Sequence, residues 1–237
     1  MSFLAHALFG GTCCLCRGGS RTAPLCGGCE ADLPRASGAR CPRCALPVPD
    51  AGAHPAPTCG RCLTERPAYD HTLALWDYAF PADVLVQLLK FRGELALAQY
   101  LGERMAALVG SAGDIDLCVP VPLHPSRLAE RGCNQSLEIA RVLCRRLRVR
   151  LSASACERAR RTGAQAGLPL GARQANVRGA FHCTTSLTGL RVAVVDDVMT
   201  TGATLDAMAR TLKDAGAAHV VNWVLARTPE PGSQAPL

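Results

Sequence analysis

The feature that most constrains this chain lies near its carboxyl end, where a short apolar run leads into two adjacent acids and a small polar loop. Residues 192–195 read V-A-V-V, a composition typical of a strand that is buried on both faces of a parallel sheet. Asp196 and Asp197 follow, and residues 200–204 supply three threonines and a glycine at the start of a helix predicted over residues 203–215. Hydroxyls and backbone N–H groups at a helix start can converge on an anion. Two carboxylates beside them suit a phosphate attached to a sugar whose vicinal hydroxyls need acceptors.

Cysteines dominate the first part of the chain. Eight of the fourteen cysteines form four C-x-x-C pairs, namely Cys13 with Cys16, Cys26 with Cys29, Cys41 with Cys44, and Cys59 with Cys62. Each pair can present two thiolates to one metal ion, and two pairs complete a tetrahedral zinc site that has no open position for a substrate. We therefore expect two structural Zn²⁺ sites. The spacing favours sequential pairing over an interleaved arrangement, and disulfides are the alternative that a reducing compartment disfavours.

Composition and charge narrow the class of protein. Hydrophobic residues make up 49% of the chain, enough for a proper core, whereas an aromatic content of 4% argues against a base-stacking platform. The first eleven residues lack a basic leader and no apolar run reaches membrane length, so we expect a cytoplasmic protein without a membrane span. Residues 120–182 hold twelve arginines against three glutamates, a local excess that can attract a polyanion.

The remaining pattern alternates strands and helices. Strands are predicted at residues 72–79 and 116–122, and helices at 81–93, at 94–108 and up to about residue 146. Residues 157–182 are polar, basic and poorly periodic. We expect a zinc-ribbon module over residues 1–66, an α/β domain over 67–228 and a flexible tail over 229–237.

Residues 192–205 resemble the phosphoribosyl-pyrophosphate (PRPP) motif of type I phosphoribosyltransferases. The resemblance implies a parallel sheet flanked by helices, with the acids on the ribose hydroxyls and the loop on the 5′-phosphate. The PRPP-binding residues would be Asp196, Asp197, Thr200, Thr201, Gly202, Ala203 and Thr204. The same resemblance implies Mg²⁺ as a cofactor, bridging the ribose hydroxyls and the diphosphate.

Other motifs occur in a fixed order and together resemble the ComF family. They read L-L-K-F-R-G at 88–93, V-P-V-P-L-H-P-S-R at 119–127, R-G-x-N-Q at 131–135 and R-T-x-x-Q at 161–165. Cys133 departs from the pattern, since an aromatic residue is expected there. The resemblance places residues 157–182 as a hood over the sugar, and it implies that Arg127, Arg131 and Arg161 assist departure of the diphosphate. The alternative for these arginines is an ordinary solvated face.

The ComF resemblance implies PRPP binding together with a role in DNA uptake, natural transformation or related DNA handling. Single-stranded DNA and competence proteins would then be partners. The alternative is an active phosphoribosyltransferase whose unidentified acceptor has nothing to do with DNA, and a PRPP sensor without turnover is a third interpretation. DNA binding predicts a steep salt dependence, whereas turnover predicts a requirement for Mg²⁺ and release of pyrophosphate.

Overall fold

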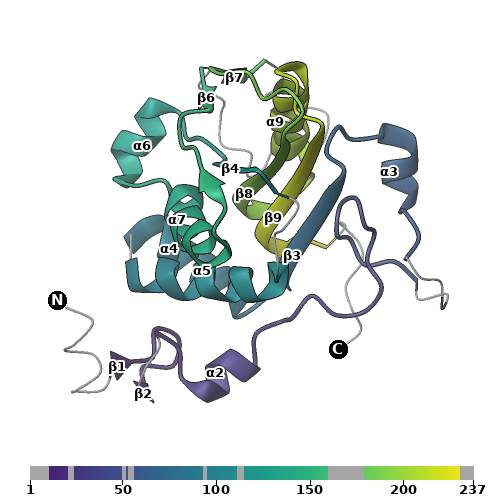
Figure 1. Ribbon diagram of the computed structural model, residues 1–237. Helices are drawn as coiled ribbons and strands as arrows, with labels where there is room; N and C mark the ends of the chain where they lie inside the picture. Colours follow the sequence, from purple (N-terminus) through teal and green to yellow (C-terminus); the bar gives the residue numbers. More distant parts are fainter. Residues whose placement is uncertain are drawn as a thin grey trace.

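A five-stranded, wholly parallel sheet organises the chain in the computed structural model (Figure 1). The structure describes residues 11–20, 24–49, 52, 56–92, 95–110, 115–159 and 179–229. The strand order is β3 (His71–Asp77), β9 (His219–Arg227), β8 (Arg191–Met199), β4 (Leu117–Pro120) and β5 (Arg150–Leu151). The expected fold class, a parallel sheet flanked by helices and preceded by cysteine-rich clusters, is confirmed.

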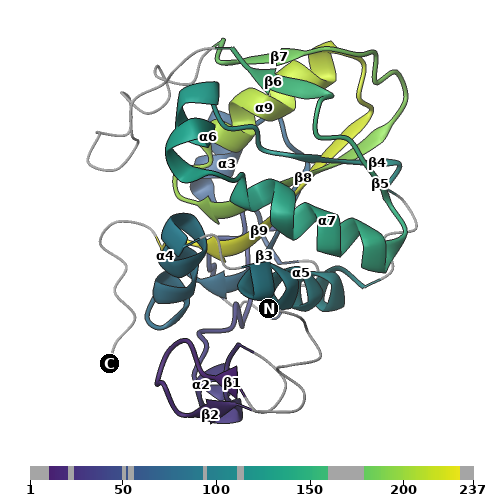
Figure 2. The same ribbon diagram turned by 90° about the vertical axis from the view of Figure 1, so that its left-hand side faces the viewer.

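Helices cover both faces of the sheet (Figure 2). α4 (Ala82–Arg92), α5 (Leu95–Val109) and α7 (Gln135–Leu147) lie on one face, and α9 (Ala203–Asp214) lies on the other. The alternation along β8 explains this, because Ala193 and Val195 pack under α5 and α7 while Val192 and Val194 pack under α9. The apolar run of β8 is therefore buried on both faces, as its composition predicts.

Two elements at the carboxyl edge of the sheet differ from the expectation. β8 does not end before the acids but continues through Asp196 and Asp197, because β9 keeps pairing with it as far as Met199. Residues 125–131, for which the sequence pattern predicts no helix, form the short helix α6 (Pro125–Arg131), in which Pro125 opens the first turn and the His124 side chain accepts from the Ser126 N–H. The extension of β8 places both acids within a hydrogen-bonded strand.

The cysteine-rich segments pack against opposite faces of the sheet. Residues 11–20 and 24–33, with β1 (Gly11–Thr12), β2 (Gly19–Ser20) and α2 (Gly27–Ala31), join the core beneath α5. Residues 41–49 and 56–62, of which the last three lie in α3 (Gly60–Glu65), join the core beneath α9. The connection between them runs along the outer edge of β3, where the Asp77 N–H donates to the Pro34 carbonyl at 2.8 Å. This contact covers an edge strand that would otherwise expose unpaired backbone groups.

A small antiparallel pair, β6 (Cys156–Arg158) with β7 (Phe181–Cys183), stands beside α9. The stretch between these strands contains most of the expected hood, and its residues 160–178 lie outside the described part of the chain. Within the described ranges, every helix is too short or too polar to cross a bilayer.

Candidate functional site

The acid pair lies at the carboxyl end of β8, next to the first turn of α7. The Ser136 hydroxyl donates to Asp196 Oδ1 at 3.1 Å, and the Asp197 N–H donates to the same oxygen at 2.9 Å. α7 begins here because the Asn134 side chain accepts from the N–H groups of Ser136 and Leu137. Asp197 forms an ion pair with Lys90 of α4, with 3.0 Å between Nζ and Oδ2. Three elements that are distant in sequence thus converge on the two carboxylates.

The two acids differ in their electrostatic surroundings. Burial raises the pKa of Asp196 to about 7, and the negative charge of Asp197 adds to the rise. The Asp197 N–H, the charge of Lys90 and the Ser136 hydroxyl act in the opposite direction on this pKa. Asp196 therefore exchanges a proton near neutral pH, and a ligand that supplies hydroxyl donors or a cation would favour its charged form.

The loop after β8 has the geometry of a small anion cradle at a helix start. Gly202 precedes α9 with a φ of 81°, in the left-handed region. A Cβ at this position would lie 2.7 Å from the Met199 methyl carbon and 2.9 Å from the Tyr69 hydroxyl, so glycine is required by conformation and by packing. A cavity of about 20 Å³ opens here and is lined by Asp196, Val198, Met199, Thr200, Gly202, Ala203, Thr204 and Leu205. The cavity faces the positive end of a twelve-residue helix.

Asp196 and most of the loop predicted from sequence therefore line one cavity. Thr201 follows in the same turn, and Asp197, next to Asp196, points to Lys90 of α4. The Thr201 hydroxyl accepts from the Ala203 N–H at 3.3 Å, which fixes the turn into α9. The residues present fit a ribose phosphate, because hydroxyl acceptors and backbone donors lie next to each other.

The described arginines among the predicted catalytic residues, Arg127 and Arg131, pair with side chains other than the two acids. Arg127 pairs with Glu130 in α6 at 3.4 Å, and Arg131 donates to Gln135 at 3.3 Å. Arg161 lies outside the described residues. Their catalytic roles stay predictions.

Sequence reasoning missed Lys90 and Ser136 as members of the site, whereas Arg158 belongs to the basic segment from residue 157 that is expected near the sugar. Lys90 and Ser136 contact the acids directly, and the charge of Asp196 acts to raise the pKa of Arg158 against the lowering caused by burial. The signal for Lys90 was present, since it is the lysine of the L-L-K-F-R-G motif. Ser136 directly follows the R-G-x-N-Q motif, and only the fold reveals that its helix begins beside Asp196.

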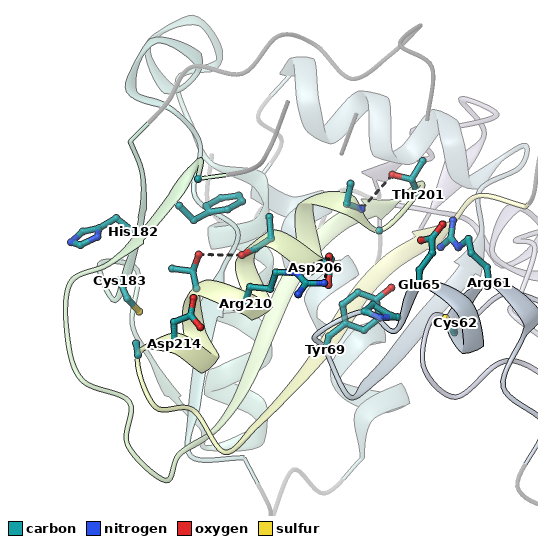
Figure 3. A pocket seen from close by; sticks show the side chains of 18 residues that line it. Arg61, Cys62, Glu65, Tyr69, His182, Cys183, Thr201, Asp206, Arg210 and Asp214 are labelled. Carbon is teal, nitrogen blue, oxygen red and sulfur yellow. Dashed lines mark hydrogen bonds and ion pairs between the residues drawn. The ribbon is translucent and has the colours of Figure 1, made fainter. Parts of the chain in front are cut away.

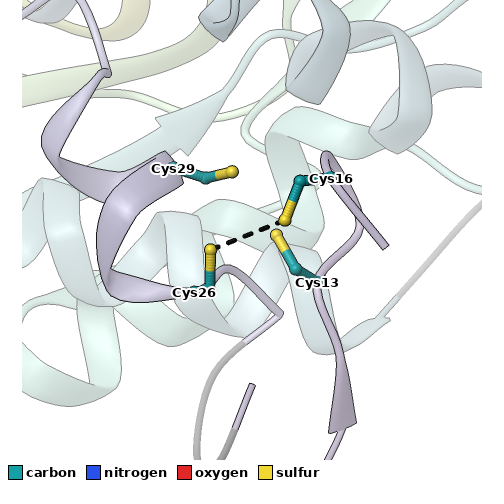
Figure 4. A group of neighbouring side chains, drawn as sticks. All are labelled: Cys13, Cys16, Cys26 and Cys29. Carbon is teal, nitrogen blue, oxygen red and sulfur yellow. Dashed lines mark hydrogen bonds between the residues drawn. The ribbon is translucent and has the colours of Figure 1, made fainter. Parts of the chain in front are cut away.

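The eight paired cysteines form two groups, and the pairing is sequential. Cys13, Cys16, Cys26 and Cys29 make the first group (Figure 4), and Cys41, Cys44, Cys59 and Cys62 make the second, with all sulfur atoms of a group within 4.8 Å of one another. The Sγ atoms of Cys16 and Cys26 are 3.6 Å apart, as are those of Cys44 and Cys59. Tetrahedral zinc with Zn–S bonds of about 2.3 Å requires sulfur atoms about 3.8 Å apart, so both groups fit this metal.

A larger groove of about 970 Å³ runs along the outer face of α9, between α3 and β7 (Figure 3). Its walls carry both signs of charge, including Arg61, Glu65 and Asp206, and Asp206 is paired with Arg210 at 3.2 Å. At one end the groove reaches Thr201 and Gly202, so the second cysteine group and the loop border the same space.

Comparison with known proteins agrees with this geometry. The family model described as "Phosphoribosyl transferase domain" matches residues 134–234, which include the acid pair and the loop. DNA utilization protein YhgH of Salmonella typhimurium is 37% identical over 194 residues, covering 79% of this chain and 84% of that protein. Competence protein F of Haemophilus influenzae is 31% identical over 226 residues, covering 91% of this chain and 96% of that protein.

Among solved structures, a hypoxanthine phosphoribosyltransferase from Staphylococcus aureus aligns over 66% of this chain and 70% of its own. The identity is 14% and the TM-score 0.37. The alignments with the two relatives cover most of this chain and most of each relative. The chain belongs to the ComF family of phosphoribosyltransferase-like proteins.

Proposed function

We propose that the chain binds PRPP together with Mg²⁺ at the carboxyl end of β8 and acts in the handling of DNA. The observation that supports the first part is that Asp196, Thr200, Gly202, Ala203 and Thr204 line one cavity at the start of α9, with Asp197 next to Asp196 and paired with Lys90. A bare phosphate site would not place two carboxylates there, whereas a ribose 5-phosphate needs acceptors and donors in this arrangement.

Each group has a defined task in this proposal. Asp196 and Asp197 accept hydrogen bonds from the ribose hydroxyls, and the backbone N–H groups and hydroxyls of the loop bind the 5′-phosphate. Lys90 and Arg158 supply positive charge beside the acids. Mg²⁺ would neutralise charge on the diphosphate. Zn²⁺ in each cysteine group would have a structural role, because four thiolates leave no open coordination position.

Calorimetric titration of PRPP with Mg²⁺ into the zinc-loaded protein tests the binding site. We expect binding to the wild type and its loss in the double variant Asp196→Asn/Asp197→Asn. Asp214→Asn is the matched control, because this exposed acid lies at the far end of α9. Equal binding by the acid-pair variant, or none by the wild type, would contradict the proposal.

The DNA part of the proposal rests on the relatives and on where arginines lie. The names of the two relatives refer to DNA utilization and to competence. Arg145, Arg148 and Arg150 are exposed where α7 ends and β5 begins. α7 starts beside Asp196, at the carboxyl ends of the strands, and runs away from it. These arginines therefore lie near the amino ends of the strands, where Arg150 pairs with Leu117 at the start of β4. In this arrangement single-stranded DNA and PRPP bind at the same time. The proposal also places the protein in the cytoplasm, in contact with competence proteins.

Fluorescence anisotropy with labelled single-stranded DNA, measured over a series of salt concentrations, tests this surface. Arg145→Glu/Arg148→Glu should weaken DNA binding and flatten its salt dependence while leaving PRPP binding unchanged. Arg35→Glu is the matched control, because this exposed arginine lies beside the opposite edge strand, β3. DNA binding that is equal in the variant and the wild type would remove this surface from the proposal.

The alternative function is an active phosphoribosyltransferase with an acceptor unrelated to DNA. The observation that favours it is the cluster of cations, Lys90 and Arg158, beside the acids where a diphosphate would leave. In that reaction the acceptor forms a bond to ribose C1 as the bond from C1 to the diphosphate breaks. Pyrophosphate release that depends on Mg²⁺ and on one acceptor, without DNA, would favour this function over the first.

A further inference from the structure

One buried arginine joins the second cysteine group to the phosphate loop. Arg227, the last residue of β9, has 1% of its surface exposed. Its Nε–H donates to the Cys44 carbonyl at 2.8 Å. Its Nη1 donates to the Met199 carbonyl at 3.0 Å and also to the Thr200 carbonyl. A single guanidinium thus connects a cysteine knuckle with both residues that open the loop.

Two neighbouring residues reinforce this connection. Tyr69 is buried against the second cysteine group, and its hydroxyl packs on Gly202 (Figure 3). The Ala68 N–H donates to Asp206 Oδ1 at 2.6 Å, in the first turn of α9. Ala68 and Tyr69, in the segment that follows α3, therefore contact the loop and the first turn of α9. Tyr69 lines the same groove as Cys62 of the second cysteine group.

The electrostatics of Arg227 depend on the cysteines. The acceptors of its hydrogen bonds to Cys44, Met199 and Thr200 are neutral carbonyl oxygens, and a buried cation of this kind needs a negative charge nearby. A divalent metal held by four cysteine thiolates would carry a net negative charge beside this guanidinium, which contacts the Cys44 carbonyl.

The first cysteine group has a different environment. It packs under α5 on the other face of the sheet, and Glu30 within it pairs with Arg104 of α5 at 3.0 Å. The two metal groups are therefore not equivalent with respect to the loop.

We infer that Arg227 is a positioning residue that couples metal occupancy of the second cysteine group to the conformation of the phosphate loop. Metal loss would release the Cys44 knuckle that the Arg227 Nε–H contacts, and would thereby loosen the carbonyls of Met199 and Thr200 that the same guanidinium holds. The consequence for ligand affinity rests on the proposed PRPP binding, but the coupling itself does not. By linkage, a ligand in the loop must also strengthen metal retention in the second group, and not in the first.

The test compares Arg227→Met and Arg227→Lys with the matched control Arg40→Met. Arg40 donates to the Ala45 carbonyl at 3.1 Å, one residue from Cys44, but its carboxylate partner is Asp77 of β3. Amide hydrogen exchange of residues 199–206 reports the loop directly, before and after zinc is removed with a chelator. PRPP affinity is measured on the same samples, and the unfolding midpoint of each variant establishes that it is folded.

We expect faster loop exchange and about tenfold weaker PRPP binding in Arg227→Met. Arg227→Lys should recover part of both, because lysine keeps the charge but cannot span all the carbonyls. In Arg40→Met the loop should exchange as in the wild type. In a chain that keeps Arg227, Cys59→Ser should speed amide hydrogen exchange of the loop, whereas Cys29→Ser should not.

Loop exchange in Arg227→Met equal to that of the wild type, or equal effects of the two cysteine variants, would overturn the inference. If the wild type fails to bind PRPP while loop exchange still follows zinc in the second group, the proposed function fails and the coupling stands. Cobalt substituted into the second group gives an independent check, since its absorption bands should shift on addition of PRPP to the wild type and not to Arg227→Met.

Discussion

At the scale of single residues, Asp196 carries a buried carboxyl whose ionisation costs stability. Its pKa of about 7 in the folded protein lies above the ordinary value of 3.8, so folding favours the protonated form. The stability associated with this carboxyl is complete below about pH 4 and is lost as the pH rises through 7. This destabilising carboxyl lies where the proposed ribose hydroxyl would need a hydrogen-bond acceptor.

Asp196→Asn should therefore stabilise the protein at pH 8 by about 1–3 kcal/mol, because a neutral amide avoids the buried charge. The gain should vanish near pH 4, and PRPP binding should be lost at both values. Thermal unfolding across this pH range measures the difference. A variant that is less stable than the wild type at pH 8 would contradict the raised pKa.

Gly202 permits a second prediction that separates crowding from backbone strain. Gly202→Ala should destabilise the protein by about 2–4 kcal/mol and weaken phosphate binding, because its Cβ would collide with Met199 and Tyr69. Gly132→Ala is the control: Gly132 has a similar φ of 75°, but a Cβ there would meet nothing within 4 Å. The control should lose only about 1 kcal/mol. Equal losses in denaturant unfolding would show that the loop is not tightly packed.

At the scale of elements, the site depends on where α7 begins. Asn134→Ala removes the cap, frees the first turn and withdraws the Ser136 hydroxyl from Asp196. We expect a loss of about 1 kcal/mol in stability and weaker PRPP binding. Asn134→Asp keeps the capping oxygen and should retain most of both. If the two variants bind PRPP equally, the first turn of α7 does not help to orient the acids.

The sequence predicts these elements well wherever the signal is local. The helices at residues 82–92, 95–109 and 203–214 lie within a few residues of the prediction, because apolar spacing and proline mark them. The pair of β6 and β7 could not be predicted, because its strands are short and pair across a segment of more than twenty residues. The extension of β8 through the acids depends on β9, a partner that the local sequence does not reveal.

The same distinction applies to the candidate site. The acids, the loop and the four cysteine pairs are contiguous motifs and could be named from sequence. Lys90 and Tyr69 reach the site only because α4 and the segment after α3 pack beside β8 and α9. Their roles depend on tertiary contacts, which no spacing rule encodes.

At the scale of the whole molecule, the two cysteine groups lie on opposite faces of one sheet, joined along the edge of β3. Removing both metals should therefore affect the entire protein and not only a detachable module. We expect chelation to lower the unfolding midpoint of the phosphoribosyltransferase-like part by several degrees. Near-UV circular dichroism of Trp223, buried in β9, monitors this part. An unchanged midpoint would indicate that the cysteine-rich segments fold and unfold independently.

In the proposed function, the acid pair and the loop bind one sugar phosphate together. Phosphorus NMR of PRPP with Mg²⁺ tests this most directly, because the 5′-phosphate and the diphosphate give separate signals. With the wild type we predict that both sets of signals shift on binding, and that Gly202→Ala reduces the shift of the 5′-phosphate most. Signals that stay at their free positions in the presence of excess wild-type protein would contradict the account.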